Sequence, residues 1–243
     1  MSLAGSLMCA RYAFMPNKLK YCGPDENKTL FEYVTNRQPD AGLAEMLAEF
    51  KGAWPNLTFI AHANGIADPL DHKVVEAYWL GNSLLNNISA KQYADYTAEQ
   101  FKKQLSPSAK EPLMKRLGAG GRPHHNFYVY YLFGLRGGKS RLITAGLPTI
   151  NQCRISWGKV RQVINDQTLL VDSEQIAWND YLGEPCLIPI TREVTCSWEG
   201  KSFVPPIQIG TYVSIHWDWV CDVLDTYQLK NLSRYDHKFL GLS

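Results

Sequence analysis

The hydrophobic period of the chain changes near residue 120, and this change limits the folds that are open to it. Before that point apolar residues recur at helical spacing: in DAGLAEMLAEFK, the side chains of Leu43, Met46, Leu47 and Phe50 fall on one helix face. After it, short runs of β-branched and aromatic residues alternate with turns, which is typical of strands. The sequence therefore predicts an α+β fold, with a helical part before a β-rich part.

Residues that favour helix N-termini precede several helical segments. A Ser or Asp side chain there accepts a hydrogen bond from a first-turn amide, and proline fits the first turn. The expected helix starts are Asp25, Asp68 with Pro69, Ser89, Ser106 with Pro107 and, for a final helix, Asp225.

The segment NFYVYYLFG has the strongest strand signal, because aromatic and β-branched residues fill it. We expect LRGGKS to form a turn and RLITAG to pair back as a β-hairpin. GLRGGKS lacks the glycine spacing of a phosphate-binding loop, and a strand is expected after it instead of a helix. On a strand, His124 and His125 would face opposite sides, so we do not expect both to bind one ion. One of them facing a site is an open alternative, but we favour a polar sheet-edge role.

The second half alternates short strands with turns. The expected strands lie in WGKVRQVI, TLLVDSEQI, CLIPITREVTCSWE and TYVSIHW, before a final helix in DTYQLKNLSRYDHKFL. The expected domains are therefore residues 1–150, mainly helical with the hairpin near the end, and residues 151–243, which are β-rich with one C-terminal helix.

Composition excludes several classes of protein. The chain has 243 residues, of which 20% are charged, and a net charge of +2, so a nucleic-acid partner is not expected. Its first residues lack the order of a signal peptide, and no apolar run is long enough to span a bilayer. We expect a cytoplasmic protein whose six irregularly spaced cysteines are free thiols or ligands, about half of them buried.

Two stretches of the β-rich part carry the clearest motif. The first begins at Cys153 and the second is a strand that ends at His216. The motif residues are Cys153, Gly158, Lys159, Val160 and Leu170-Val171-Asp172, then Gly210, Tyr212, Val213 and His216. In order, spacing and final helix, residues 151–239 resemble the HypC/HupF chaperones of nickel–iron hydrogenase assembly.

This resemblance implies a fold and a function. It implies a small OB-like β-barrel over residues 151–220, closed by the final helix. The chaperones carry iron with its CO and cyanide ligands to the hydrogenase large subunit, so the implied partner is that subunit or another maturation protein. Cys153 would be the thiolate ligand of the iron, and His216 its neighbour at one rim of the barrel.

The chain also departs from the family pattern. The family cysteine follows the initiator methionine, whereas Cys153 is internal. Trp157 stands where the family has proline, and Trp217-Asp218-Trp219 follows the histidine. These differences leave room for a different ligand or partner.

The N-terminal segment CARYAFMPNKLKYCGPD is similar to the signature of a poorly characterised bacterial family with the same HypC-like tail. One interpretation is a packed segment with one buried thiol. The other is a composite site, in which Cys9 or Cys22 reaches Cys153 while Arg11 and Asn17 hold a polar ligand, since one thiolate and one imidazole are an incomplete ligand set.

Three functions follow from this reading. The first is an iron-binding metallochaperone for hydrogenase maturation, which binds iron or a small-ligand intermediate through Cys153 and His216. The alternative is an enzyme that acts on a one-carbon or other small ligand, with Cys153 as nucleophile and His216 as base. The third is a structural subunit whose barrel only mediates contacts.

Overall fold

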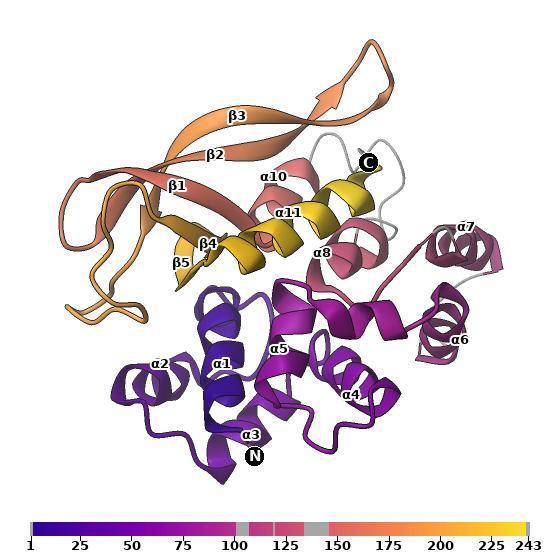
Figure 1. Ribbon diagram of the computed structural model, residues 1–243, viewed down its shortest axis with the longest axis horizontal. Helices are drawn as coiled ribbons and strands as arrows, with labels where there is room; N and C mark the ends of the chain where they lie inside the picture. Colours follow the sequence, from indigo (N-terminus) through magenta and orange to yellow (C-terminus); the bar gives the residue numbers. More distant parts are fainter. Residues whose placement is uncertain (1, 101–106, 119, 134–145, 242–243) are drawn as a thin grey trace.

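The computed structural model describes residues 2–100, 107–118, 120–133 and 146–241, and it places helices before a five-stranded sheet and a C-terminal helix (Figure 1). The helices are α1 (Leu3–Lys18), α2 (Asn27–Asn36), α3 (Ala41–Ala48), α4 (Trp54–Ala63), α5 (His72–Trp79), the 3-10 helix η1 (Ser83–Asn87), α6 (Ala90–Gln100), α7 (Pro107–Gly118), α8 (His125–Phe127), the π-helical η2 (Tyr128–Phe133), α10 (Leu147–Cys153) and α11 (Thr226–Leu240). The predicted α+β class is confirmed. Among the described helices, none has the length and apolar character needed to cross a membrane.

Several predicted helix starts are confirmed. Ser89 accepts a hydrogen bond from the Gln92 amide at the start of α6, and Asp225 makes a full capping box with Gln228 at the start of α11. Helix α7 begins at Pro107.

Two predicted caps are wrong. Helix α2 starts after Glu26, which makes no side-chain cap bond, and not at Asp25. Helix α5 is capped by Asp71, whose carboxylate accepts from the Lys73 amide, while Asp68 accepts hydrogen bonds from the amides of Ser2 and Leu70. Asp68 thus fastens the N-terminus instead of starting a helix.

The predicted β-hairpin after residue 125 is wrong where the structure describes it. Residues 125–133 form α8 and η2, while residues 134–145, with the expected turn, lie outside the described part. Strand propensity reflects fit to a half-buried sheet surface. Here Phe127 and Val129 are instead buried among helices, and Asn126 bonds to the backbone of Ile155 through both its side-chain oxygen and nitrogen. Tertiary contacts therefore override the local preference.

The strands close into a barrel in the order β1-β2-β3-β5-β4. Their bounds are β1 (Ser156–Val163), β2 (Thr168–Asn179), β3 (Glu184–Thr195), β4 (Tyr212–His216) and β5 (Trp219–Val223). All neighbours are antiparallel except β3 and β5, which pair in parallel through Thr195 and Trp219. Alternate side chains fill the interior, as the period of two requires. This inner cluster includes Val160, Leu169, Val171, Val194, Val213, Ile215 and Val220.

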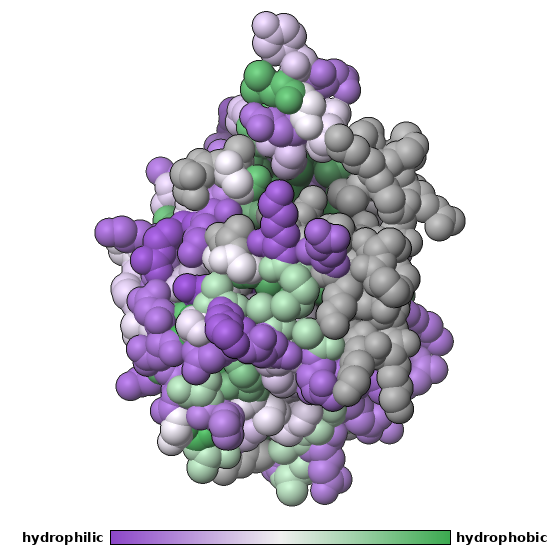
Figure 2. Space-filling view, turned by 90° about the vertical axis from the view of Figure 1, so that its right-hand side faces the viewer, coloured by the Kyte–Doolittle hydropathy of each residue, from purple (hydrophilic) through white to green (hydrophobic). Residues whose placement is uncertain are grey.

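The β2–β3 pair extends beyond the barrel. β1 pairs with β2 from Leu169 to Ser173, whereas β2 and β3 remain paired as far as Asn179 and Glu184. The resulting two-stranded arm projects from the body in Figure 1 and forms the upper end of the molecule in Figure 2.

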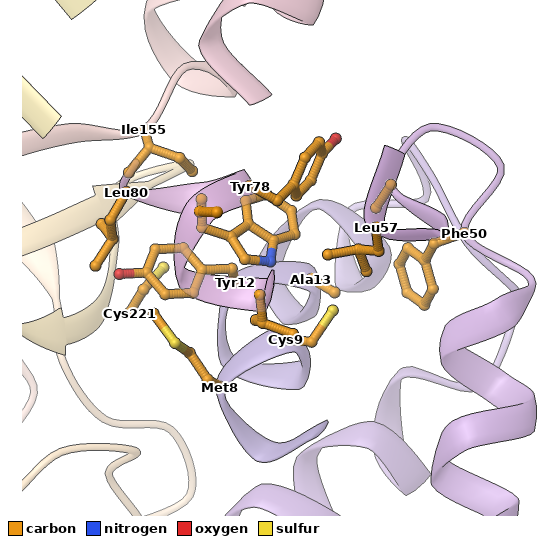
Figure 3. Close-up of a cluster of buried hydrophobic side chains, with 14 of the residues drawn as sticks. Met8, Cys9, Tyr12, Ala13, Phe50, Leu57, Tyr78, Leu80, Ile155 and Cys221 are labelled. Atoms are coloured by element: carbon orange, nitrogen blue, oxygen red, sulfur yellow. The ribbon is translucent and has the colours of Figure 1, made fainter. Parts of the chain in front are cut away.

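The hydrophobic cluster of the helical part also includes residues of the β-rich part, beside the separate cluster inside the barrel. Figure 3 shows Met8, Cys9 and Tyr12 of α1 in the same buried cluster as Ile155 and Cys221 of the β-rich part. Helix α1 also holds the sheet through polar contacts, because Arg11 pairs with Asp222 at 2.6 Å and the Tyr12 hydroxyl lies 2.8 Å from that of Ser214. The two parts therefore pack against each other across the boundary expected near residue 150.

Candidate metal centre

Three potential metal ligands come together where the helical part meets the barrel. Ligand atoms of His125, Cys153 and His216 all lie within 4.8 Å of one another. His125 begins α8, Cys153 ends α10 and His216 ends β4, so three separate elements supply them. The predicted proximity of Cys153 and His216 is confirmed, and His125 joins them, although a sheet-edge role was favoured for it.

The chain directions at this point follow from local structure. Cys153 does not open a strand, as the sequence pattern indicated; it is the last residue of α10, and β1 starts at Ser156. The strand β4 stops at His216 because Trp217 and Asp218 form a tight turn, both with left-handed φ angles of 54° and 51°. The Trp217 amide donates to the Gln152 carbonyl at 2.8 Å, which ties this turn to the end of α10.

The three ligands line a cavity of about 180 Å³. Its walls come from α1, the segments after α1 and after α3, the end of α5, and η2. Most of these walls are apolar or aromatic, with Phe50, Tyr78, Trp79, Val129 and Trp217 among them. Water-poor surroundings strengthen any interaction between a cation and its ligands.

The hydrogen bonds of both histidines leave one ring nitrogen for a ligand. His216 donates from Nδ1 to the Tyr12 carbonyl at 2.7 Å, while its buried Nε2 has no hydrogen-bond partner. His125 donates from Nε2 to the Cys153 carbonyl at 2.8 Å, which leaves the lone pair on Nδ1, 3.3 Å from the Tyr78 hydroxyl. That hydroxyl can donate to the Gly52 carbonyl instead, 3.2 Å away. Metal-binding histidines usually donate their second nitrogen to a carbonyl or carboxylate in this way.

Burial keeps all three ligands neutral in the metal-free protein. It lowers the pKa of His125 to about 4, and burial together with the neighbouring His125 lowers that of His216 to about 3. It also raises the pKa of the Cys153 thiol to about 12. The thiol is therefore protonated at neutral pH, while both imidazoles are unprotonated and able to bind a cation.

The N-terminal residues predicted for the site divide into two groups. Cys22 lines the cavity, together with Tyr21. Cys9 is buried in α1 beside Trp79 and is not among the cavity-lining residues; burial raises the pKa of its thiol to about 12. Of the two cysteines, the structure thus brings only Cys22 to the cavity.

In the part of the chain that the structure describes, the side chains of Arg11 and Asn17 make contacts that stabilise the fold. Arg11 pairs with Asp222 on β5. The side-chain amide of Asn17 donates to the carbonyls of Cys22 and Pro24, so it fixes the backbone of the segment that carries Cys22. The prediction that these residues hold a polar ligand remains untested.

The side chains of His124 and His125 lie in different surroundings, as predicted. The two residues are at the start of helix α8, however, and not on a strand. His124 caps α8 by accepting from the Asn126 amide, and its ring packs against Tyr235 and Phe239 of α11. Both histidines are buried, so the expected sheet-edge role is also wrong. The adjacent histidines were the sequence signal for His125 as a ligand, and the incorrect strand assignment concealed it.

A buried polar network lies directly behind the site. Asp236 of α11 pairs with Arg154 at 2.7 Å and accepts hydrogen bonds from Asn126 and Tyr130. Arg154 follows Cys153 in the chain, and Asn126 follows His125. The network therefore connects the backbones of two of the three candidate ligands to the C-terminal helix.

One of the comparisons with known proteins gave a match, which is to a protein family. The model of a family described as "Family of unknown function (DUF6390)" matches residues 1–243. No curated protein and no solved structure matches the chain. The resemblance of the barrel to the HypC/HupF chaperones therefore remains a prediction. Because the family model covers the full sequence, the chain belongs to the DUF6390 family.

Proposed function

We propose that this protein binds a transition-metal ion through His125, Cys153 and His216, and that it acts as an accessory protein in the assembly of an iron-containing centre of nickel–iron hydrogenases. The observation that carries the proposal is the group of three ligands within 4.8 Å of one another beside a cavity of about 180 Å³.

The chemistry of the ligands supports metal binding. One thiol and two imidazoles suit iron, zinc, copper and nickel, whereas magnesium and calcium prefer oxygen ligands. Coordination displaces the proton of the thiol, so a buried neutral cysteine is compatible with a thiolate ligand once the cation is present. Three protein ligands leave a coordination position open, and the cavity offers room for a small second ligand at that position.

The resemblance supports the assignment to hydrogenase maturation. A chaperone of this kind binds an iron fragment and later releases it to the large subunit or to another maturation protein. Here the cargo would be iron with its small ligands, and the apolar walls would exclude water from it. A site made by three separate elements could also release its cargo when those elements move apart.

The enzymatic alternative has less support. A nucleophilic cysteine normally has a lowered pKa, because the thiolate is the reactive form. Burial raises the pKa of Cys153 instead, and His216 lacks the proton that would make it a stabilising cation. The described surroundings therefore favour a ligand over a nucleophile.

Metal analysis after anaerobic purification tests the proposal. We expect one iron ion per chain in the native protein or after addition of ferrous ion, and loss of that iron in Cys153→Ala, His216→Ala and His125→Ala. His124→Asn is the matched control, because His124 is equally buried but faces α11. Equal iron content in the native protein and all three ligand variants would contradict the site.

The cellular role needs a separate measurement. Hydrogenase activity of the host should fall when the gene is deleted and should return with the native gene, but not with Cys153→Ala. Iron binding without any effect on hydrogenase activity would retain the metal site and reject the maturation role.

A further inference from the structure

Cys22 occupies a position that the three-ligand site does not explain. Among the residues that line the cavity, Tyr21 and Cys22 are exposed, whereas His125 and His216 are 8% and 1% exposed. Cys22 is therefore the sulfur at the outer end of the cavity, and Cys153 is the sulfur at the inner end. The unpartnered Nε2 of His216 lies in the same cavity, which gives the cavity an unfilled ligand position independent of Cys22.

The segment that carries Cys22 is held at several points. The Asn17 amide binds the carbonyls on both sides of Gly23. Gly23 has a left-handed φ of 84°, and a Cβ atom there would lie 2.4 Å from the Phe50 ring. The Tyr21 ring stacks on Trp217 with centroids 4.0 Å apart. These contacts fix an otherwise exposed segment over the cavity.

Cys22 and Cys153 line the same cavity, although they lie far apart in the sequence. An ion held at the Cys22 sulfur is therefore already inside the space that the three inner ligands line.

We infer that Cys22 is the entry thiol of the metal site, which takes up the incoming ion at the mouth of the cavity and passes it to Cys153, His125 and His216. This role rests on the proposed function, because it requires that the inner ligands bind metal. Tyr21 precedes Cys22 in the chain, and its ring stacks on that of Trp217. Both aromatic residues line the cavity together with the entry thiol.

The transfer is a ligand exchange without a change of oxidation state. The Cys22 thiol loses its proton as its sulfur binds the ion. The ion then binds the sulfur of Cys153, whose proton leaves to solvent, and the bond to Cys22 breaks as Cys22 takes up a proton again. The net reaction releases one proton for each ion that reaches Cys153.

Rapid mixing of the full-length metal-free protein with Co²⁺ tests this role, because thiolate–cobalt absorption reports sulfur ligation and the visible bands report coordination. The variants are Cys22→Ser and Cys22→Ala. Cys186→Ser is the matched control, since Cys186 is a half-buried thiol on the β2–β3 arm. Thermal unfolding of the metal-free variants confirms that each is folded.

We expect both Cys22 variants to reach the final spectrum and the stoichiometry of the native protein, but at a lower loading rate. The Cys186 variant should load at the native rate. Native loading rates in the Cys22 variants would overturn the entry role, and so would an altered final spectrum, which would make Cys22 a permanent ligand. If the native protein takes up no Co²⁺, the proposed metal site itself fails, and this result is distinct from either outcome.

Discussion

The Nδ1 atom of His216 donates a hydrogen bond to the backbone carbonyl of Tyr12, 2.7 Å away. His216 is the last residue of the barrel strand β4, whereas Tyr12 lies on the N-terminal helix, 204 positions earlier in the chain. The helical part thus sets the tautomer of a barrel residue and directs its other nitrogen into the cavity. In this protein the N-terminal helices complete the site that the barrel begins.

Metal binding should stabilise the folded protein. A ligand that binds only the native state adds about 2.7 kcal/mol to the free energy of unfolding at a concentration 100 times its dissociation constant. We expect the thermal midpoint to rise with added Co²⁺ and to return to the metal-free value with a chelator. The midpoint of Cys153→Ala should not respond, and an equal rise in that variant would place the binding elsewhere.

Stability of the metal-free protein should fall on acidification. Burial lowers the pKa of His125 to about 4, and lowers those of His124 and His216 to about 3, so the folded state stays unprotonated where the unfolded chain takes up protons. The contribution of these histidines to the free energy of unfolding is fully present above the ordinary histidine pKa of about 6.5. It is lost as the pH falls toward 3, at up to about 1.4 kcal/mol per pH unit for each histidine. Urea unfolding at several pH values measures this slope.

The variant His124→Asn tests whether the buried histidines cause this dependence of stability on pH. In His124→Asn the new side chain can still cap α8, because asparagine is a good N-cap residue. The slope should then decrease by the contribution of one histidine. An unchanged slope would show that other groups cause the acid sensitivity.

Asp236→Asn should strongly destabilise the protein. The substitution removes the negative charge that pairs with the guanidinium of Arg154 at 2.7 Å, and Arg154 is only 2% exposed. Removing one member of a buried ion pair costs about 3 kcal/mol or more. Metal affinity should fall as well, because the network connects the segments of His125 and Cys153. Chemical unfolding and Co²⁺ titration measure the two effects.

Asp95→Asn is the control for that prediction. It removes the exposed ion pair between Asp95 and Lys91 on α6, and neither residue belongs to the network around Asp236. We expect native stability and metal affinity. A destabilisation equal to that of Asp236→Asn would mean that burial does not account for the effect.

Gly23→Ala should disturb the segment of Cys22. The added Cβ would lie 2.4 Å from the Phe50 ring, and the φ of 84° is unfavourable for alanine. Gly65→Ala is a matched control with a φ of 66° and no atom within 4 Å of the new Cβ. Both variants lose about 1 kcal/mol from the backbone strain, but only Gly23→Ala should also slow Co²⁺ loading. Equal loading rates would mean that the fit of Gly23 against Phe50 does not position the thiol.

The sequence by itself determined the features that depend on local chemistry. The caps Ser89 and Asp225, the amphipathic face of Leu43, Met46 and Leu47, and the alternation of the strands were all readable, because each rests on contacts between residues close in sequence. The approach of Cys153 to His216 was expected from the resemblance to the HypC/HupF chaperones. The pairing of β1 with β4 brings them together in the structure, although Cys153 ends a helix and does not start the strand.

Only the tertiary structure decided which distant residues join the site. Residues 126–133 have strand propensity, but burial against helices and the contacts of Asn126 with Ile155 make them helical, and this places His125 in the cavity. The choice of Cys22 over Cys9 likewise depends on the direction of α1, which turns Cys9 into the core and leaves Cys22 at the mouth. Contacts between residues that are far apart in the sequence are set by packing of the whole core, and they carry no signal in a local sequence pattern.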